Sequence, residues 1–292
     1  MHADEVDTDA ELVRRLVAEQ HSRWSDLDVT PVLPRGTDNA LYRLGAEMVV
    51  RLPRRDINVP ALLTELEWLP RLAPQLTLSI PIPLATGVAG AGFPFPWAVY
   101  RWIDGLPATP DRLADAQETA LDLARFIVAL ERVDTTGGPP PGGRGGPLAA
   151  RDAAMRRAVD ALGDAVDGSA ILARWDEAMR APAWDGPGVW VHGDLDARNV
   201  LARAGRIHAV IDFGSLAVGD PACDVMVAWK MLSPAARPIF RGAVDVDEAT
   251  WTRARGWTLS QSLIALGYYT RETNAVLVDE AWRWLDAVLA EP

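Results

Sequence analysis

Residues 191–201 read Val-His-Gly-Asp-Leu-Asp-Ala-Arg-Asn-Val-Leu, and residues 210–214 read Val-Ile-Asp-Phe-Gly. These two stretches place three polar side chains at fixed intervals: Asp194, then Asn199 five positions later, then Asp212 thirteen positions after that. Asn199 and Asp212 each lie at the edge of an apolar run, which is the pattern of a short strand. The spacing therefore predicts that both are held by ordered elements.

This order and spacing is typical of a phosphoryl-transfer centre, in which a loop Asp acts on the acceptor while an Asn and a further Asp before Phe-Gly bind metal. We assign Asp194 as the catalytic carboxylate that orients the acceptor hydroxyl and takes its proton. Asn199 and Asp212 are assigned as ligands of Mg²⁺, a hard cation that prefers oxygen donors. An ordinary loop with a turn at Asp212 is the alternative, and each stretch alone favours it. The two stretches together favour a kinase.

The chain resembles the aminoglycoside phosphotransferase-like family of small-molecule kinases, which is related to choline kinase. That family has His-Gly-Asp where protein kinases have His-Arg-Asp, and this sequence has His192-Gly193-Asp194. Residues 219–224, Gly-Asp-Pro-Ala-Cys-Asp, are close to the family's Gly-Asp-Pro-x-x-Asp. A protein kinase is disfavoured because no Ala-Pro-Glu segment follows residues 212–214.

The resemblance implies an α+β, two-lobed, protein-kinase-like fold. Residues 1–104 are expected to form an N-terminal nucleotide-binding lobe, a small antiparallel sheet with one packed helix. Residues 105–292 are expected to form a larger, mainly helical C-terminal lobe that carries catalysis and substrate binding. Apolar periodicity predicts helices and strands that agree with this division, namely helices over 9–23, 60–72 and 114–131 and strands over 48–52 and 97–100. The glycine- and proline-rich run over 137–146 predicts a flexible loop.

A kinase needs a cation on the α- and β-phosphates of its nucleotide, held by an acid on a nearby helix. In the family this cation is usually a Lys on the third strand, and Arg51 stands at the matching position. Arg binds phosphate bidentately but is bulkier than Lys, so the phosphate geometry is expected to differ. We expect Glu65 to hold Arg51. The alternative is that Arg51 caps a strand end and Glu65 is solvated.

The turn over residues 35–39 can offer backbone N–H groups to the nucleotide phosphates. It lacks a Gly-x-Gly-x-x-Gly pattern, so an ordinary β-turn is an equal alternative. The positions that we assign to phosphate binding are Gly36, Thr37, Asp38 and Asn39. The resemblance further implies that the Arg101 carbonyl and the Ile103 N–H pair with the purine edge, which leaves ATP and GTP both open.

The acceptor is expected to be a small hydroxylated molecule, best matched by a cationic aminoglycoside-type antibiotic. Its pocket is expected on the late helices, where carboxylates would receive ammonium groups and aromatic faces would receive sugar rings. The candidate carboxylates are Asp245, Asp247, Glu248, Glu272, Asp279 and Glu280. The candidate aromatic residues are Trp229, Trp257, Tyr268 and Tyr269. Ordinary core packing and solvated acids are the alternative for each of these residues.

Other functions stay open at this point. The abundance of Trp, 12 residues, suits a pocket for an apolar macrolide as well. A metabolic kinase acting on a sugar or an amino alcohol is a further alternative, and a catalytically silent kinase-like binding protein is an alternative outside the enzymes. The intact Asp194, Asn199 and Asp212 disfavour the silent protein, whereas the Arg at position 51 keeps it in question.

The composition and net charge limit the classes of binding partner, the cellular compartment and the source that we expect. The formal net charge of −11 makes nucleic acid an improbable partner; an acidic surface attracts a polycationic ligand or merely keeps the protein in solution. No apolar run approaches the ~20 residues that span a bilayer, so no membrane association is expected. One cysteine and an acidic N-terminus without an apolar core lead us to expect the cytoplasm. An Arg-rich composition with one lysine points to a bacterial source, in resistance or metabolism.

Overall fold

The computed structural model describes residues 5–33 and 36–291, and the chain divides into two compact units. The N-terminal unit comprises Met1–Gln75, Ser79–Gly105 and Ala209–Gly214. The C-terminal unit comprises Leu76–Leu78, Leu106–His208 and Ser215–Pro292. Asp212 therefore belongs to the N-terminal unit although it lies late in the sequence. The assignment of nucleotide binding to 1–104 and of catalysis to 105–292 stays a prediction.

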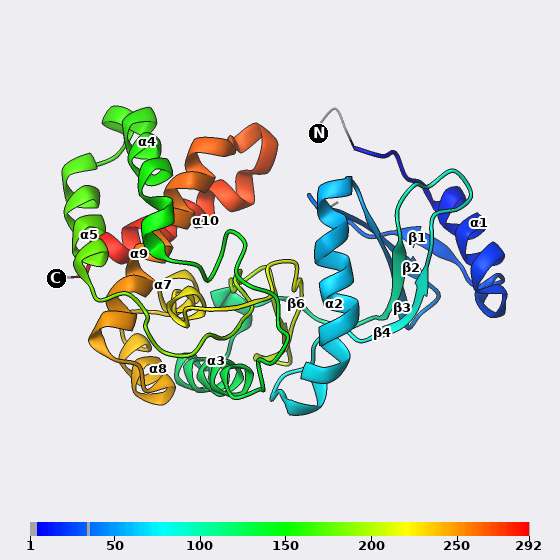
Figure 1. Cartoon of the computed structure of the whole chain (residues 1–292), viewed down its shortest axis with the longest axis horizontal. Coiled ribbons are helices and arrows are strands. Elements are labelled where there is room, and N and C mark those ends of the chain that lie inside the picture. Colours follow the sequence, from blue (N-terminus) through cyan, green and yellow to red (C-terminus); the bar gives the residue numbers. More distant parts are fainter. Residues whose placement is uncertain (1–4, 34–35, 292) are drawn as a thin grey trace. The chain divides into compact units, whose positions relative to one another are not determined.

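The N-terminal unit contains an antiparallel sheet of five strands in the order β1-β2-β3-β5-β4 (Figure 1). Its strands are β1 (Val29–Pro31), β2 (Asn39–Leu44), β3 (Met48–Pro53), β4 (Pro83–Gly87) and β5 (Trp97–Arg101). Arg51 of the central strand β3 pairs in register with Leu41 of β2 and with Ala98 of β5. This central place fixes the backbone of Arg51 from both sides.

Two α-helices pack on this sheet, α1 (Ala10–Gln20) and α2 (Val59–Leu72), where we expected one. Helix α1 begins at Asp9, whose Oδ1 accepts the Leu12 N–H at 2.7 Å, as an N-cap residue should. Leu16 of α1 lies in one apolar cluster with Val50 and Leu52 of β3. Because side chains alternate along a strand, Arg51 between them faces the other side of the sheet.

Helix α2 presents a carboxylate on its buried side. The buried positions are Leu62, Glu65, Trp68, Leu69 and Leu72, which follow the three-and-four spacing of a helix face. Leu63, which an all-leucine stripe would include, is half exposed. The helix is thus turned so that Glu65, rather than a leucine, occupies the middle of the packed face.

The C-terminal unit is mainly helical. Its α-helices are α3 (Ala116–Glu131), α4 (Asp152–Leu162), α5 (Gly168–Arg180), α6 (Ala222–Val225), α7 (Val227–Met231), α8 (Arg237–Val244), α9 (Glu248–Tyr268) and α10 (Arg271–Leu289). Its strands are β6 (Leu106–Pro107), β7 (Val189–Val191), β8 (Val200–Arg203), β9 (Arg206–Val210) and β10 (Ala217–Gly219), of which β9 ends in the N-terminal unit. Short 3₁₀ helices in the two units are η1 (Ser22–Trp24), η2 (Asp56–Asn58), η3 (Ala73–Gln75), η4 (Pro110–Arg112), η5 (Leu148–Arg151) and η6 (Gly163–Ala165).

Helix α9 forms the centre of this unit and packs against α4, α5, α6 and α10. Strands β7 and β10 pair antiparallel, with Val191 opposite Ala217, and the loop over residues 192–199 joins β7 to β8. The antiparallel N-terminal sheet and the helical C-terminal part confirm the expected α+β class. None of the helices in the described part of the chain combines the length and apolar character required to cross a bilayer.

The glycine-rich segment (residues 137–146), which we expected to be a flexible loop, has no helix or strand and is held at two positions by backbone hydrogen bonds. The Val218 N–H donates to the Pro139 carbonyl and the Asp220 N–H donates to the Gly145 carbonyl, both at 2.8 Å. Gly145 has a φ of 76°, and a Cβ there would approach the Val191 side chain to 2.9 Å. Glycine is thus needed for close approach of two chain segments rather than for mobility.

Candidate active site

The 192–199 loop is held by one buried carboxylate of the C-terminal unit. Asp224 accepts the His192 N–H through Oδ2 at 2.7 Å and the Gly193 N–H through Oδ1 at 2.8 Å. The fully buried His192 ring accepts the Asp194 N–H through Nδ1 at 3.1 Å. His192 and Asp224 therefore brace the backbone that carries Asp194.

Gly193 turns the chain between these two supports. Its φ of 82° lies in the left-handed region, and a Cβ there would come within 2.9 Å of Ser215. Both conditions exclude larger residues without local strain. The Gly of the His-Gly-Asp motif is therefore required by the shape of the loop.

Asn199 and Asp194 are brought together by the same loop. Asn199 Nδ2 donates to the Asp194 backbone carbonyl at 2.9 Å and approaches Asp194 Oδ2 at 3.4 Å. With the amide nitrogen directed at Asp194, the Asn199 Oδ1 accepts no hydrogen bond from the described residues. An amide oxygen left in this way can serve as a metal ligand.

Three cations surround the carboxylates of this loop. Arg144 Nη1 donates to Asp194 Oδ1 at 2.6 Å, and Lys230 Nζ lies 3.8 Å from the same oxygen. Arg198 pairs with Asp196 within the loop and with Glu280 of α10 at 3.0 Å. Burial opposes ionisation of Asp194, but Arg144 and Lys230 outweigh it and hold the pKa of this carboxyl well below its ordinary value. Asp194 is therefore a carboxylate at neutral pH.

The corresponding cation of the N-terminal unit is Arg51. Its Nη1 donates to Glu65 Oε1 at 2.8 Å and to Oε2 at 2.7 Å, and the Tyr100 hydroxyl donates to Oε2 at 3.1 Å. Burial opposes the charge on Arg51, yet Glu65 and Asp212 outweigh it and raise the pKa of the guanidinium. Burial and the neighbouring Glu65 also raise the pKa of Tyr100, which keeps its hydroxyl a donor. Arg51 is thus a fixed positive charge.

The second edge of the Arg51 guanidinium faces polar groups of two other segments. Its Nη2 lies 3.4 Å from Asp212 Oδ1. With its amide turned so that oxygen faces the guanidinium, Asn39 accepts from Nη2 at 2.9 Å and from Nε at 3.1 Å. Asp212 has a φ of 63° and a side chain that is 55% exposed, so its second oxygen is open. A non-glycine residue in this conformation is uncommon and clusters at functional sites.

Of the predicted turn, Gly36, Thr37 and Asp38 are exposed and Asn39 begins β2, whereas Arg35 lies outside the described residues. Packing around its carboxyl, followed by repulsion from Asp212, raises the pKa of Asp38. A phosphate role for this turn stays a prediction.

The segment after β5 carries the predicted base contacts. Arg101 is exposed at the end of β5, and its N–H donates to the Ile82 carbonyl at 3.0 Å. The Ile103 N–H has no hydrogen-bond partner within residues 5–33 and 36–291, so it is available to a ligand. Pairing of these two residues with a purine stays a prediction.

Among the described residues, no group of three or more His, Cys, Asp or Glu side chains could hold a metal ion. A kinase metal does not require such a group, because nucleotide phosphates and water supply most of its ligands. The open Oδ1 of Asn199 and the half-exposed carboxylate of Asp212 fit the donor types that Mg²⁺ prefers.

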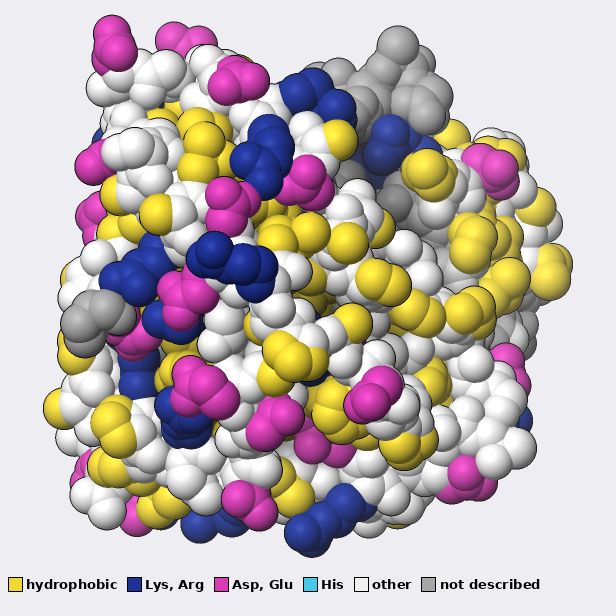
Figure 2. Space-filling view, turned by 60° about the vertical axis from the view of Figure 1, so that its left-hand side comes forward, with side chains coloured by type: hydrophobic (Ala, Val, Ile, Leu, Met, Phe, Trp, Pro, Cys, Tyr) yellow, Lys and Arg dark blue, Asp and Glu magenta, His cyan; other side chains and the backbone are white. Residues whose placement is uncertain are grey.

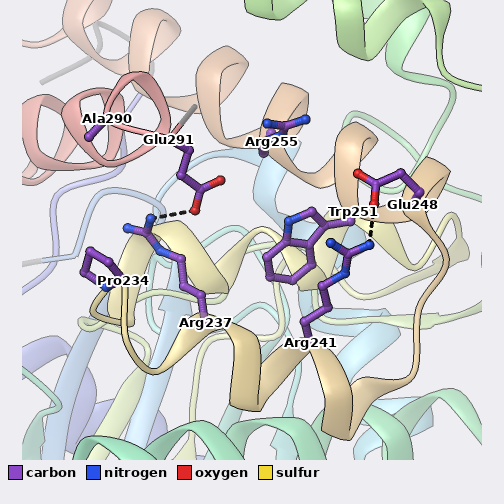
Figure 3. Close-up of a pocket in the computed structure, with 8 residues that line it drawn as sticks. All are labelled: Pro234, Arg237, Arg241, Glu248, Trp251, Arg255, Ala290 and Glu291. Carbon is purple, nitrogen blue, oxygen red and sulfur yellow. Dashed lines mark hydrogen bonds and ion pairs between the residues drawn. The ribbon is translucent and has the colours of Figure 1, made fainter.

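The acidic residues predicted for the acceptor do not gather in one place. Glu280 is buried against Arg198, and Asp279 pairs with Arg271 at 2.6 Å. Glu248 lines a pocket of about 390 Å³, but Arg237, Arg241 and Arg255 line it too. Figure 3 shows Glu248 directed at Arg241 beside the Trp251 ring. On the face drawn in Figure 2, acidic side chains lie among basic ones rather than in one patch.

The predicted aromatic residues also separate. Trp229 and Trp257 are buried in the core, where Trp229 packs against Trp251 with ring centroids 4.6 Å apart. Tyr268 is exposed and packs edge-on against Tyr269. The core alternative therefore holds for the two tryptophans.

A comparison with models of protein families shows the family to which the chain belongs. The model of the phosphotransferase enzyme family matches residues 29–257. The chain belongs to the phosphotransferase enzyme family. Membership of this family agrees with the His-Gly-Asp motif and with the resemblance stated above. A comparison with curated proteins gave no significant match.

Solved structures of other phosphotransferases share the fold of this family member. The GDP and kanamycin complex of APH(2")-IIIa is 20% identical over 95% of this chain and 98% of that chain, with a TM-score of 0.73. ADP-bound aminoglycoside phosphotransferase APH(2'')-Ib is 18% identical over 96% and 98%, with a TM-score of 0.63. The macrolide 2'-phosphotransferase MphH of Brachybacterium faecium, an apoenzyme, is 24% identical over 97% and 98%, with a TM-score of 0.61. At these identities the likeness shows the fold.

Proposed function

We propose that this phosphotransferase moves the terminal phosphoryl group of ATP or GTP to a hydroxyl group of a small molecule. The carrying observation is the geometry of Asp194, an ionised and partly exposed carboxylate on a braced loop, hydrogen-bonded to Asn199. An ionised carboxylate at this place can accept a hydrogen bond from the acceptor hydroxyl and later its proton. The family match supports the reaction class.

In this proposal the acceptor oxygen forms a bond to the terminal phosphorus while the bond from that phosphorus to the bridging oxygen breaks. The nucleoside diphosphate leaves with the bonding electron pair, and Asp194 takes the hydroxyl proton. Arg51, held by Glu65, binds the α- and β-phosphates as a fixed charge. Gly36, Thr37, Asp38 and Asn39 offer backbone groups to the phosphates, and Arg101 and Ile103 offer backbone groups to the base.

We propose Mg²⁺ as the cofactor, with Asn199 and Asp212 as its protein ligands. The ion would neutralise charge on the nucleotide phosphates. The open oxygens of both side chains support this assignment.

For the acceptor, an aminoglycoside is the first class to test, because a structural neighbour is a complex with kanamycin. The dispersed carboxylates of the late helices give this class no support of their own. A macrolide is the second candidate, since a macrolide phosphotransferase shares the fold. A sugar or an amino alcohol is the third, and no residue of the structure favours either.

The test is mass spectrometry of these acceptor classes after incubation with the protein, Mg²⁺ and ATP or GTP. A gain of one phosphoryl group in one class identifies reaction, donor and acceptor together. Asp194→Asn should lower turnover by roughly 10²–10⁴-fold while nucleotide affinity stays the same, because the hydroxyl loses its acceptor. Full turnover in this variant would remove Asp194 from the mechanism. Nucleotide binding without Mg²⁺-dependent transfer or hydrolysis would favour the silent binding protein.

A further inference from the structure

The glycine-rich segment carries one charged side chain, Arg144, and this side chain reaches the proposed catalytic carboxylate. Its Nη1 donates to Asp194 Oδ1 at 2.6 Å and to the Gly193 carbonyl at 2.9 Å. Arg144 thus bonds a side chain and the adjacent backbone of the same loop. Such a double contact limits the rotation of the Asp194 side chain as well as its charge state.

Lys230 approaches the same carboxylate from inside the unit. It is the only lysine of the sequence, and its side chain on α7 is fully buried. Its Nζ lies 3.8 Å from Asp194 Oδ1, donates to Gln261 Oε1 at 2.7 Å and lies 4.3 Å from the centre of the Trp284 ring. A buried ammonium needs such partners, because desolvation without them is costly.

Arg144 and Lys230 therefore both contact Oδ1 of Asp194, and neither contacts Oδ2. Oδ1 receives Arg144 and Lys230, whereas Oδ2 has only the 3.4 Å approach of Asn199 Nδ2 among the described residues. The Asp194 side chain is about a quarter exposed, and Oδ2 is the oxygen with the fewer and longer contacts. The two oxygens are thus made chemically distinct by the fold.

We propose that Arg144 is a positioning residue of the phosphoryl transfer: with Lys230 it fixes Asp194 Oδ1, so that Oδ2 receives the acceptor hydroxyl. This inference rests on the proposed function, because it assigns work to a reaction that the proposal describes. The segment that carries Arg144 is itself fixed by the backbone contacts of Pro139 and Gly145, so the guanidinium is delivered by a rigid support. Small displacements of a reacting group cost large factors in rate, which gives such support a purpose.

The test compares Arg144→Gln with a matched control, Arg151→Gln. Arg151 lies just beyond the glycine-rich segment and donates to the Gly143 carbonyl at 2.9 Å and to Ser260 Oγ at 2.6 Å, with no carboxylate partner among the described residues. We expect Arg144→Gln to lower kcat by about 10- to 100-fold with KM for the nucleotide within about twofold of the wild type. Arg144→Lys should recover part of the loss, and Arg151→Gln should stay near the wild type.

A double substitution shows whether Arg144 acts through Asp194. In the Asp194→Asn background, Arg144→Gln should cost no further rate, because residues that act as a unit are not additive. Circular dichroism and nucleotide affinity of each variant report whether it is folded. Equal losses in Arg144→Gln and Arg151→Gln would assign the effect to loop order and overturn the proposal, as would an unchanged kcat in Arg144→Gln. A wild-type protein that transfers no phosphoryl group would instead reject the proposed function.

Discussion

Two arginine–carboxylate pairs, one in each unit, differ in how far their side chains are exposed to solvent. In the Arg51–Glu65 pair the carboxylate side chain is 0% exposed and the arginine 10%, and Tyr100 closes the carboxylate further. In the Arg144–Asp194 pair the arginine is 30% exposed and the carboxylate 26%. The first pair hides its acid entirely and keeps an edge of the arginine for Asp212 and Asn39. The second pair leaves one oxygen of its acid open.

This difference in exposure indicates which residue of each pair can still bind a ligand or accept a proton. A buried carboxylate that accepts three hydrogen bonds, as Glu65 does, has no remaining role other than to hold its arginine. A carboxylate whose second oxygen has one long contact among the described residues, as Asp194 Oδ2 has with Asn199 Nδ2 at 3.4 Å, can still accept a proton. An arginine–carboxylate pair thus supplies a cation in one unit and, in the proposed mechanism, a base in the other.

The largest effect on stability is expected from Glu65→Gln. This substitution leaves a buried guanidinium without its main counter-charge, and breaking such a pair typically costs roughly 3–5 kcal/mol. The corresponding amide substitution at Asp194 should lower the free energy of unfolding by less than this, because the Arg144–Asp194 pair is partly solvated. Urea unfolding of both variants measures the difference. Similar losses in the two variants would mean that exposure does not separate the two pairs.

A third carboxyl, Glu131, tests the comparison further, because it is half-buried and has no cationic partner among the described residues. Burial and the neighbouring Asp224 raise the pKa of Glu131, the last residue of α3, to about 7, and its Oε1 has no hydrogen-bond partner among the described residues. The folded state therefore binds a proton that the unfolded state releases near its ordinary value of 4.5. Stability should fall as pH rises between these two values.

Glu131→Gln removes this penalty. At pH 8 the variant should be more stable than the wild type by roughly 3 kcal/mol, and near pH 5 the difference should shrink to less than about 1 kcal/mol. Glu118→Gln on the same helix is the control, since Glu118 is an exposed partner of Arg206. Unfolding measured at both pH values decides the matter. A pH-independent difference would show that Glu131 is ionised in the folded protein.

The smallest effect is expected from Arg51→Lys, which keeps the charge beside Glu65. An ammonium has no second edge for Asp212 and Asn39, so we expect a loss of about 1 kcal/mol in stability and a few-fold weaker nucleotide binding. Titration with ATP and GTP measures the affinity. Tighter binding in this variant would show that the site is shaped for lysine and only tolerates the arginine.

Much of the site was predictable because its residues lie in short motifs or on periodic elements. The 192–199 loop is local in sequence, and the pairing of Arg51 with Glu65 follows from a strand and the helix after it. The residues that we predicted for the acceptor pocket could not be placed in this way. The face that each of them presents depends on how the C-terminal helices are rotated about their axes. In the sequence Glu280 cannot be distinguished from a solvent-exposed acid on a helix, whereas in the structure it is buried against Arg198.

Two supporting cations were missed for the same reason. Arg144 stands among glycines and prolines in a run that we expected to be flexible, and Lys230 stands in an apolar helix. Neither has a motif, and their contact with Asp194 joins positions 50 and 36 residues apart in the chain. The available signals were compositional: one charge in a glycine-rich run, and one lysine in a chain whose other basic residues are arginine.

The sequence by itself determined the reaction class and the candidate site residues, because phosphoryl transfer needs particular side chains at particular local spacings. It also determined the elements that carry them, since apolar periodicity is a local property. Only the tertiary structure decided which oxygen of Asp194 is open, which carboxylate is hidden behind Arg51, and that the glycine-rich segment is a rigid support. Those features depend on burial and long-range approach, which no local spacing encodes.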